Sequence, residues 1–208
     1  MLKQQRKIKK KKKPKSKLKD WQMLLLVGLG NPSRDNENSR HNVGFKIINA
    51  INKKFGLSKQ KPKFKGLLTT GNIGHKKVYA IKPLTFMNNS GICIRELIEY
   101  FKIDSVDVIV FHDDLDIHLG KITVKFGGSS AGHNGIESID KFIGKDYSRV
   151  RIGIGRPERK SMVTDHVLDN FTDDEENSIT ELTKNIVEYL PVLIDKKLNL
   201  FSSKVNQS

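Results

Sequence analysis

The alternation of short, continuous apolar runs with stretches of helical periodicity most constrains the fold of this chain. The first apolar run, from Met23 to about Leu29, leaves through a glycine-rich exit, which is typical of a buried strand. The stretch 41–55 then places apolar side chains at helical spacing, and Gly56 follows as a candidate helix cap. A chain that alternates buried strands with helices is expected to fold as an α/β domain.

The rest of the chain continues this alternation and adds one local hairpin. We expect further strands at 64–72, 77–82, 106–111, 121–126 and 149–154. We expect further helices at 89–100, 134–143, 164–170 and 173–195, with Pro191 inside the last of them. The pattern predicts a single α/β domain over residues 23–200, with a mixed central sheet flanked by helices on both faces. The polar residues 201–208 are expected to be frayed.

The positive charge of the chain is concentrated at its N-terminus. Lys and Arg number 38 against 23 Asp and Glu, a net charge of +15, and residues 1–20 hold eleven of the basic side chains and one acid. We therefore expect residues 1–22 to be a basic, disordered tail. The tail is either an inert extension or an arm that attracts nucleic acid, and Met23, at the start of the first strand, could be the natural start.

Composition excludes several classes of protein. The single cysteine, Cys93, rules out an intrachain disulfide framework and a zinc site built from several cysteines, and it fits a reducing compartment. The apolar run 23–27 is too short to cross a bilayer, and it does not lead into a cleavage site. We expect a cytoplasmic protein that has no membrane partner.

Four unusual segments follow the ends of predicted strands, where ligands gather in open α/β sheets. They are Gly28–Pro32 with Ser39–Asn42, Thr85–Asn88, His112–Asp116 and Gly127–Gly135. The first segment fits a dinucleotide fingerprint poorly, because Ser33 stands at its third glycine position and Pro32 interrupts the turn. The acidic segment admits three interpretations: a metal site, a solvated cluster, or one aspartate that orients a histidine. The metal site would use His112, Asp113, Asp114 and Asp116.

His41 is the most suggestive single residue. A neutral imidazole can deprotonate water near physiological pH, and it does so better when a carboxylate holds its other ring nitrogen. Asp113 is a candidate for that carboxylate. Three asparagines at predicted turns, Asn31, Asn88 and Asn134, could bind a peptide backbone or an oxyanion without adding charge.

Taken in order, these segments resemble the signature blocks of bacterial-type peptidyl-tRNA hydrolase. The blocks are Gly28–Pro32, Arg40–Phe45, Lys82–Gly91, His112–Asp116, Gly132–Gly135 and Arg151–Pro157. The ten-residue step from Asn31 to His41 also fits the family. The resemblance runs from about Leu24 to the C-terminal helix, and six blocks in order are far more specific than any one motif.

The resemblance implies a monomeric esterase that cuts the bond between a peptide and the terminal ribose of tRNA, without a metal or organic cofactor. It implies that His41 is the general base and that Asp113 holds and polarises it. It assigns the remaining roles as substrate binding by Asn31, Asn36, Met87, Asn88 and Asn134, and clamping of the acceptor-stem 5′-phosphate by Lys125 and Arg151. His133 is expected to be structural. The chain departs from the family pattern at Ser33, Asn36 and Ser39, where the family usually has Gly, Tyr and Thr.

Two other classes of function compete with the esterase. One is a non-enzymatic RNA-binding protein on the same fold, since plastid intron-splicing relatives of the hydrolase exist. The other is a metal-dependent hydrolase that uses His112 and the acids after it. Intact His41, Asp113 and Asn88 favour the esterase, although a retained fold and motif do not by themselves prove turnover.

Overall fold

The fold is that of a computed structural model, which describes residues 23–33 and 36–208. The expected basic tail, residues 1–22, lies outside the described residues. Within the described ranges, seven strands form one sheet in the order β2-β3-β4-β1-β5-β7-β6. The strands are β1 (Met23–Gly28), β2 (Lys61–Lys63), β3 (Gly66–Ile73), β4 (Lys76–Pro83), β5 (Val108–Asp114), β6 (Ile122–Phe126) and β7 (Ser148–Gly153).

The middle of the sheet is parallel and its borders are antiparallel. Strands β4, β1, β5 and β7 run side by side in the same direction. Strands β2 and β3 continue the sheet antiparallel beyond β4, and β6 pairs antiparallel with β7 at the other border. The expected mixed sheet is confirmed, and the carboxyl ends of four strands meet along one edge.

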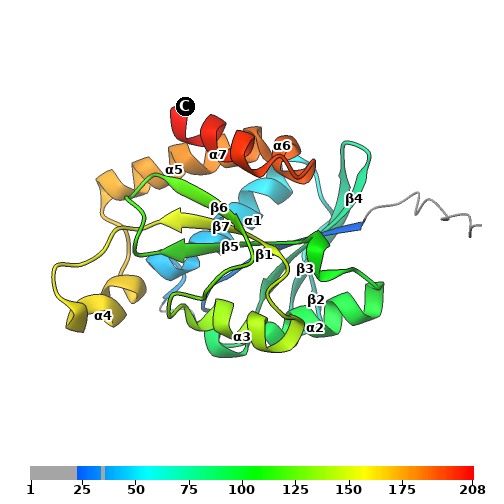
Figure 1. The fold of residues 1–208 in the computed structure, drawn as a ribbon, viewed down its shortest axis with the longest axis horizontal. Helices are drawn as coiled ribbons and strands as arrows, with labels where there is room; N and C mark the ends of the chain where they lie inside the picture. Colours follow the sequence, from blue (N-terminus) through cyan, green and yellow to red (C-terminus); the bar gives the residue numbers. More distant parts are fainter. Residues whose placement is uncertain (1–22, 34–35) are drawn as a thin grey trace, which may run out of the picture.

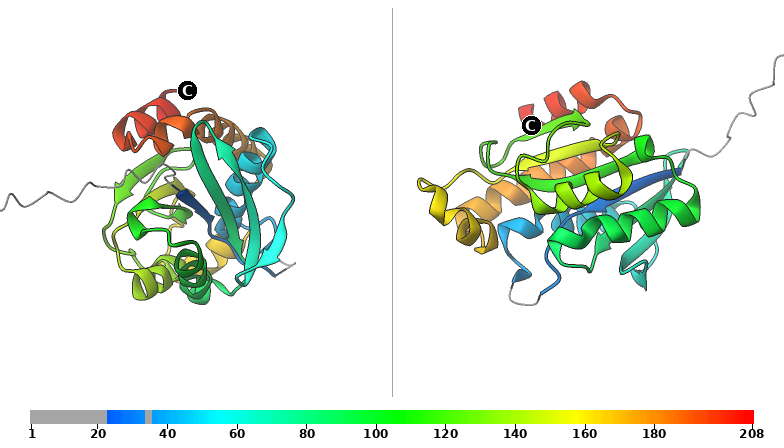
Figure 2. Two further views of the ribbon diagram at one scale, coloured as in Figure 1. Left: turned by 90° about the vertical axis from the view of Figure 1, so that its right-hand side faces the viewer. Right: turned by 60° about the horizontal axis from the view of Figure 1, so that its bottom comes forward.

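Helices cover both faces of the sheet, as the sequence predicts (Figure 1). The helices are α1 (Val43–Lys54), α2 (Ser90–Phe101), α3 (Asn134–Ile143), α4 (Val163–Leu168), α5 (Asp173–Glu188), α6 (Leu190–Ile194) and α7 (Leu198–Gln207). One buried cluster joins the sheet to α1, α5, α6 and α7, and a second joins the opposite face to α2 and α3. Figure 2 shows the sheet between these two layers.

The long helix expected near the C-terminus and strand β2 both differ from the sequence-based expectation for physical reasons. The helix expected at 173–195 is broken after Glu188, because Pro191 has no N–H to donate to the preceding turn; it lies instead in the first turn of α6. Strand β2 has no apolar signal that could have predicted it, since its three residues, Lys61, Pro62 and Lys63, are all exposed.

The expectation of a frayed C-terminus at 201–208 is wrong. Helix α7 continues to Gln207, and Phe201 and Val205, one helical turn apart, are buried in the core. The side chain of Asn206 also bonds the backbone of Ile122 in β6: its Oδ1 accepts from Ile122 N at 2.9 Å and its Nδ2 donates to Ile122 O at 2.9 Å. The C-terminal helix therefore covers the outer border of β6.

Helix α1 approaches the sheet unusually closely at its first turn. A Cβ added to Gly44 would lie 2.5 Å from the backbone nitrogen of Leu29 and 2.5 Å from the backbone oxygen of Phe111. Only glycine permits this contact. The close approach places the short 3-10 turn η2 (Arg40–Asn42), which directly precedes α1, over the carboxyl ends of β1 and β5.

Candidate active site

Three side chains from separate elements meet at the carboxyl end of β5. His41 Nδ1, from η2, lies 2.8 Å from Asp113 Oδ1, and His133 Nε2, from the turn before α3, lies 3.1 Å from the same oxygen. The Asp113 side chain is 3% exposed and that of His41 13% exposed. The structure thus brings together the histidine and aspartate that the sequence singles out, and it adds a second histidine.

His133 has two contacts that define its tautomer. Its Nδ1 accepts hydrogen bonds from the backbone nitrogens of Gly135 and Ile136, at 3.1 and 3.3 Å, and so caps helix α3. A nitrogen that accepts carries no proton, so the proton of the neutral ring lies on Nε2 and is donated to Asp113. The sequence predicts a structural role for His133, and the structure shows that this cap also supports the candidate site.

The charges of this cluster reinforce one another. Burial would raise the pKa of Asp113, but His41 and His133 outweigh it, so the pKa lies well below its usual value and the group is a carboxylate. Burial would lower the pKa of His41, yet the charge and hydrogen bond of Asp113 prevail and raise it. Because a carboxylate only accepts, His41 Nδ1 carries the shared proton and its Nε2 is left as the basic nitrogen.

The turn after β1 is held by Asn42, a residue that the sequence analysis does not single out. Asn42 Oδ1 accepts from Asn31 N at 2.5 Å, and its Nδ2 donates to the carbonyl oxygens of Asn31, Asn36 and Glu37. Asn31 Oδ1 in turn accepts from Ser33 N at 3.2 Å. Asn31 and Asn36 are thus placed by Asn42 through their backbones, and within the described residues the Asn36 side chain makes no hydrogen bond.

The remaining substrate-binding candidates lie on neighbouring turns. Met87, in the 3-10 turn η3 (Met87–Asn89), is buried, and a Cβ added to Gly135 would lie 2.5 Å from its Sδ. Asn88 and Asn134 are exposed, and neither side chain has a hydrogen-bond partner in the described part of the chain. The packing of Met87 on Gly135 joins η3 to the start of α3, and both amides remain free to bind a ligand.

Lys125 and Arg151 lie together on one face of the sheet. Lys125 in β6 pairs with Arg149 in β7, and Thr123 pairs with Arg151, so Lys125 and Arg151 are diagonal neighbours. Such neighbours are about 7–8 Å apart. Lys125 is exposed, whereas Arg151 is half-buried and donates from Nε to Asp114 Oδ2 at 2.7 Å. This spacing suits a pair of cations that share one phosphate.

The structure argues against a metal site in the acidic segment His112–Asp116, because its candidate ligands bond to other protein groups. His112 Nδ1 bonds the backbone oxygen of Asp113 at 2.7 Å, and burial lowers the pKa of His112 to about 3. Asp114 pairs with Arg151, and Asp116 pairs with Arg156. These four side chains do not converge.

Among the described residues, one group does present three possible ligand atoms to a metal ion. His41, Asp113 and His133 offer atoms that lie within 4.8 Å of one another. In the structure, these atoms are instead hydrogen-bonded to one another: His41 Nδ1 and His133 Nε2 both contact Asp113 Oδ1.

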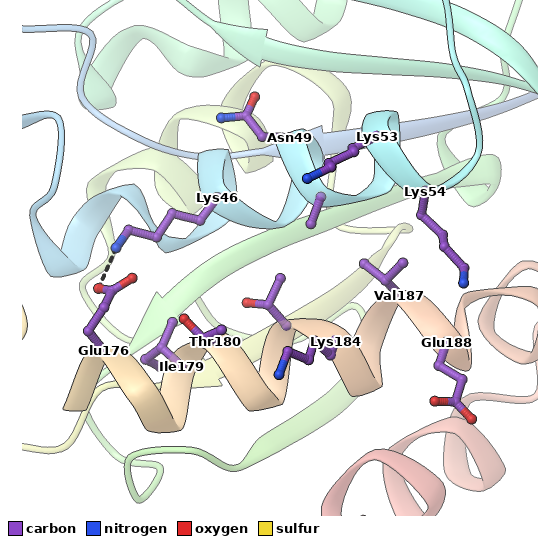
Figure 3. Close-up of a pocket in the computed structure, with 12 residues that line it drawn as sticks. Lys46, Asn49, Lys53, Lys54, Glu176, Ile179, Thr180, Lys184, Val187 and Glu188 are labelled. Atoms are coloured by element: carbon purple, nitrogen blue, oxygen red, sulfur yellow. Dashed lines mark hydrogen bonds and ion pairs between the residues drawn. The ribbon is translucent and has the colours of Figure 1, made fainter. Parts of the chain in front are cut away.

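Two hollows lie outside the histidine–aspartate cluster. A groove of about 950 Å³ runs between α1 and α5 (Figure 3). An ion pair crosses one end of it, with Lys46 Nζ 2.5 Å from Glu176 Oε2. None of the expected site residues lines this groove. A hollow of about 440 Å³ lies beside the turn after β1, lined in part by Asn31 and Lys82.

No helix in the described ranges is both long enough and apolar enough to span a membrane.

Known proteins match both the sequence and the fold. A family model described as peptidyl-tRNA hydrolase matches residues 25–208. The peptidyl-tRNA hydrolase of Pelagibacter ubique is 75% identical over 184 residues, which cover 88% of this chain and 99% of that protein. That of Bacillus subtilis is 43% identical over 188 residues, covering 88% of this chain and all of that protein.

A solved structure agrees with these sequence matches. The crystal structure of peptidyl-tRNA hydrolase from Acinetobacter baumannii superposes with a TM-score of 0.84 at 33% identity, covering 89% of this chain and 95% of that one. The family match covers the sheet from Leu25 onward and every segment that forms the histidine–aspartate cluster. The chain therefore belongs to the peptidyl-tRNA hydrolase family.

Proposed function

We propose that this protein hydrolyses the ester bond between the peptide and the tRNA in peptidyl-tRNA, with His41 as the general base. The observation that carries the proposal is the 2.8 Å contact between His41 Nδ1 and the buried Asp113 carboxylate. That contact leaves Nε2 of His41 as the nitrogen that can accept a proton from water.

The reaction follows from this arrangement. Water attacks the carbonyl carbon of the ester while its proton passes to His41 Nε2, and Asp113 stabilises the imidazolium that forms. The tetrahedral intermediate then collapses, and the proton passes to the departing ribose oxygen. The products are a peptide with a free carboxyl group and a tRNA with a free terminal hydroxyl. No step requires a metal or an organic cofactor.

Neutral side chains around the base bind the substrate. The exposed amides of Asn88 and Asn134, together with Asn31, bind the peptide main chain and the negative oxygen of the intermediate. Met87 forms an apolar wall beside them, and Asn36 completes the substrate-binding set. Neutral amides suit this task because they stabilise charge as it develops without shifting the pKa of His41.

The tRNA is recognised through its acceptor stem. Lys125 supplies a point charge and Arg151 a planar fork to the 5′-phosphate. Replacing both by Ala should raise KM for 5′-phosphorylated tRNA and leave little discrimination against tRNA that lacks this phosphate. Unchanged discrimination would place the phosphate site elsewhere. We expect a monomer that acts in the cytoplasm.

The decisive experiment compares an N-blocked aminoacyl-tRNA with the unblocked form. The protein should hydrolyse only the blocked form, which mimics a peptide. The variant His41→Asn should lose about 10²–10⁴-fold in turnover and keep its affinity for tRNA. A protein that binds tRNA but hydrolyses neither form would be the non-enzymatic RNA-binding alternative.

A further inference from the structure

We propose that Asp114 is a positioning residue that sets the guanidinium of Arg151 for the 5′-phosphate of tRNA. The proposal rests on the proposed function, since it takes Arg151 as half of the phosphate clamp. It assigns a task to a buried acid that the hydrolytic mechanism does not use.

The contact between Asp114 and Arg151 is specific in its atoms. Arg151 Nε donates to Asp114 Oδ2 at 2.7 Å, and the side chains are 17% and 8% exposed. The other carboxylate oxygen, Asp114 Oδ1, accepts from the backbone nitrogen of Asp116 at 2.9 Å, which fixes the rotation of the carboxylate. Within the described residues, the two terminal nitrogens of Arg151 have no protein partner.

A second arginine on the same strand shows the opposite arrangement. Arg149 donates from Nη1 to Ser129 O at 2.9 Å and from Nη2 to Asp140 Oδ1 at 2.7 Å, and its side chain is 3% exposed. Its two terminal nitrogens are therefore occupied by the protein. Among the residues that the structure describes, Arg151 is held only through Nε, so its planar pair of terminal N–H groups remains available to an anion.

This mode of restraint suits phosphate recognition. A guanidinium binds phosphate best through two parallel N–H groups, and an unrestrained arginine must lose many rotamers to present them. The bond to Asp114 restricts the rotamers of Arg151 before the phosphate binds, so less conformational entropy is lost on binding. The anchored Nε also leaves the opposite edge of the guanidinium facing away from the Asp114 carboxylate, where a phosphate meets least repulsion.

The position of Asp114 links this clamp to the hydrolytic cluster. Asp113 and Asp114 are consecutive residues of β5, and successive side chains of a strand point to opposite faces. Asp113 orients His41 and Asp114 orients Arg151. The carboxyl end of β5 thus fixes the distance between the general base, His41, and the phosphate clamp. The acceptor stem must span this fixed distance when it binds.

The test uses the full chain and N-blocked aminoacyl-tRNA with either a 5′-phosphate or a 5′-hydroxyl. In Asp114→Asn, the preference for the phosphorylated substrate, measured as the ratio of the two KM values, should fall about tenfold. Asp114→Glu keeps the negative charge and should lose less of this preference. In an Arg151→Ala background, Asp114→Asn should change the preference no further, because the group that it positions is gone.

A matched control separates this role from a general effect of lost charge. Asp116→Asn removes the neighbouring carboxylate, which pairs with the exposed Arg156, and it should keep the parent preference. If Arg151→Ala abolishes the preference while both Asp114 variants keep it, the positioning role is wrong and the clamp stands. If Arg151→Ala itself keeps the preference, the clamp of the proposed function is wrong. An equal loss of kcat on both substrates, with the preference intact, would also overturn the positioning role.

Discussion

Replacing Asp113 by Asn isolates the electrostatic support of the general base. Asparagine keeps an oxygen that can accept from His41 Nδ1, so the ring stays oriented while the charge is lost. At about 4 Å between charge centres and an effective dielectric constant of about 20, a carboxylate and an imidazolium attract by about 4 kcal/mol. Because about 1.4 kcal/mol of barrier is a factor of ten, kcat should fall about a thousandfold.

The pH profile of the same variant gives a second, independent sign. In the parent protein the pKa of His41 is raised above 6.5, since Asp113 outweighs the effect of burial. A general base acts only when neutral, so the parent rate falls as the pH drops through that raised pKa. In Asp113→Asn the burial remains and the charge is gone. The acidic limb of kcat/KM should therefore move to lower pH.

The assay is hydrolysis of N-blocked aminoacyl-tRNA, followed across the acidic and neutral range for the parent and for Asp113→Asn. Asp116→Asn is the matched control, because it removes a carboxylate three residues away that is exposed and paired with Arg156. Circular dichroism establishes that all three proteins are folded. An Asp113→Asn variant with the parent kcat and an unshifted acidic limb would refute the pairing as the source of basicity.

Three further predictions concern other parts of the chain. A protein that begins at Met23 should keep kcat, and its affinity for tRNA should depend less on salt. The slope of log affinity against log salt concentration should become shallower by about 0.7–0.9 for each lost phosphate contact, whereas identical slopes would show that the tail does not touch RNA. Glu175→Ala should lower the free energy of unfolding by about 2–3 kcal/mol in urea denaturation, because Glu175 bonds Arg40 at 2.6 Å and completes the capping box of α5 with Thr172; an unchanged midpoint would contradict this. Hydrolysis should survive excess EDTA, and a loss restored by a divalent metal would favour a metal-dependent hydrolase.

Periodicity predicts most of the fold, because strong local patterns agree with the tertiary structure. Helix α3 begins and ends where its apolar spacing and the following Gly144 indicate. Local patterns fail where an element is stabilised mainly by its neighbours. Strand β2 exists because β3 pairs with it, and α7 is stabilised by the burial of Phe201 and Val205 against the rest of the core.

The candidate site divides in a similar way. The contact between His41 and Asp113 could be expected, because Asp113 lies at the carboxyl end of β5 and His41 follows the neighbouring parallel strand β1. The contact of His133 with Asp113 could not, since it depends on where the first turn of α3 lies relative to β5. The bond from Arg151 to Asp114 depends likewise on the register of β5 with β7, which no local pattern encodes.

The side-chain amide of Asn206 determines at which stage of folding one border of the sheet is protected from pairing with another chain. An open sheet border offers backbone N–H and C=O groups to another chain. At β2 the composition of the strand protects that border, since Pro62 has no N–H and exposed lysines repel a second copy. At β6 the protection arrives only when α7, which follows every strand in the chain, docks and Asn206 bonds Ile122. A nascent or truncated chain that lacks α7 would expose β6 and be prone to aggregate there.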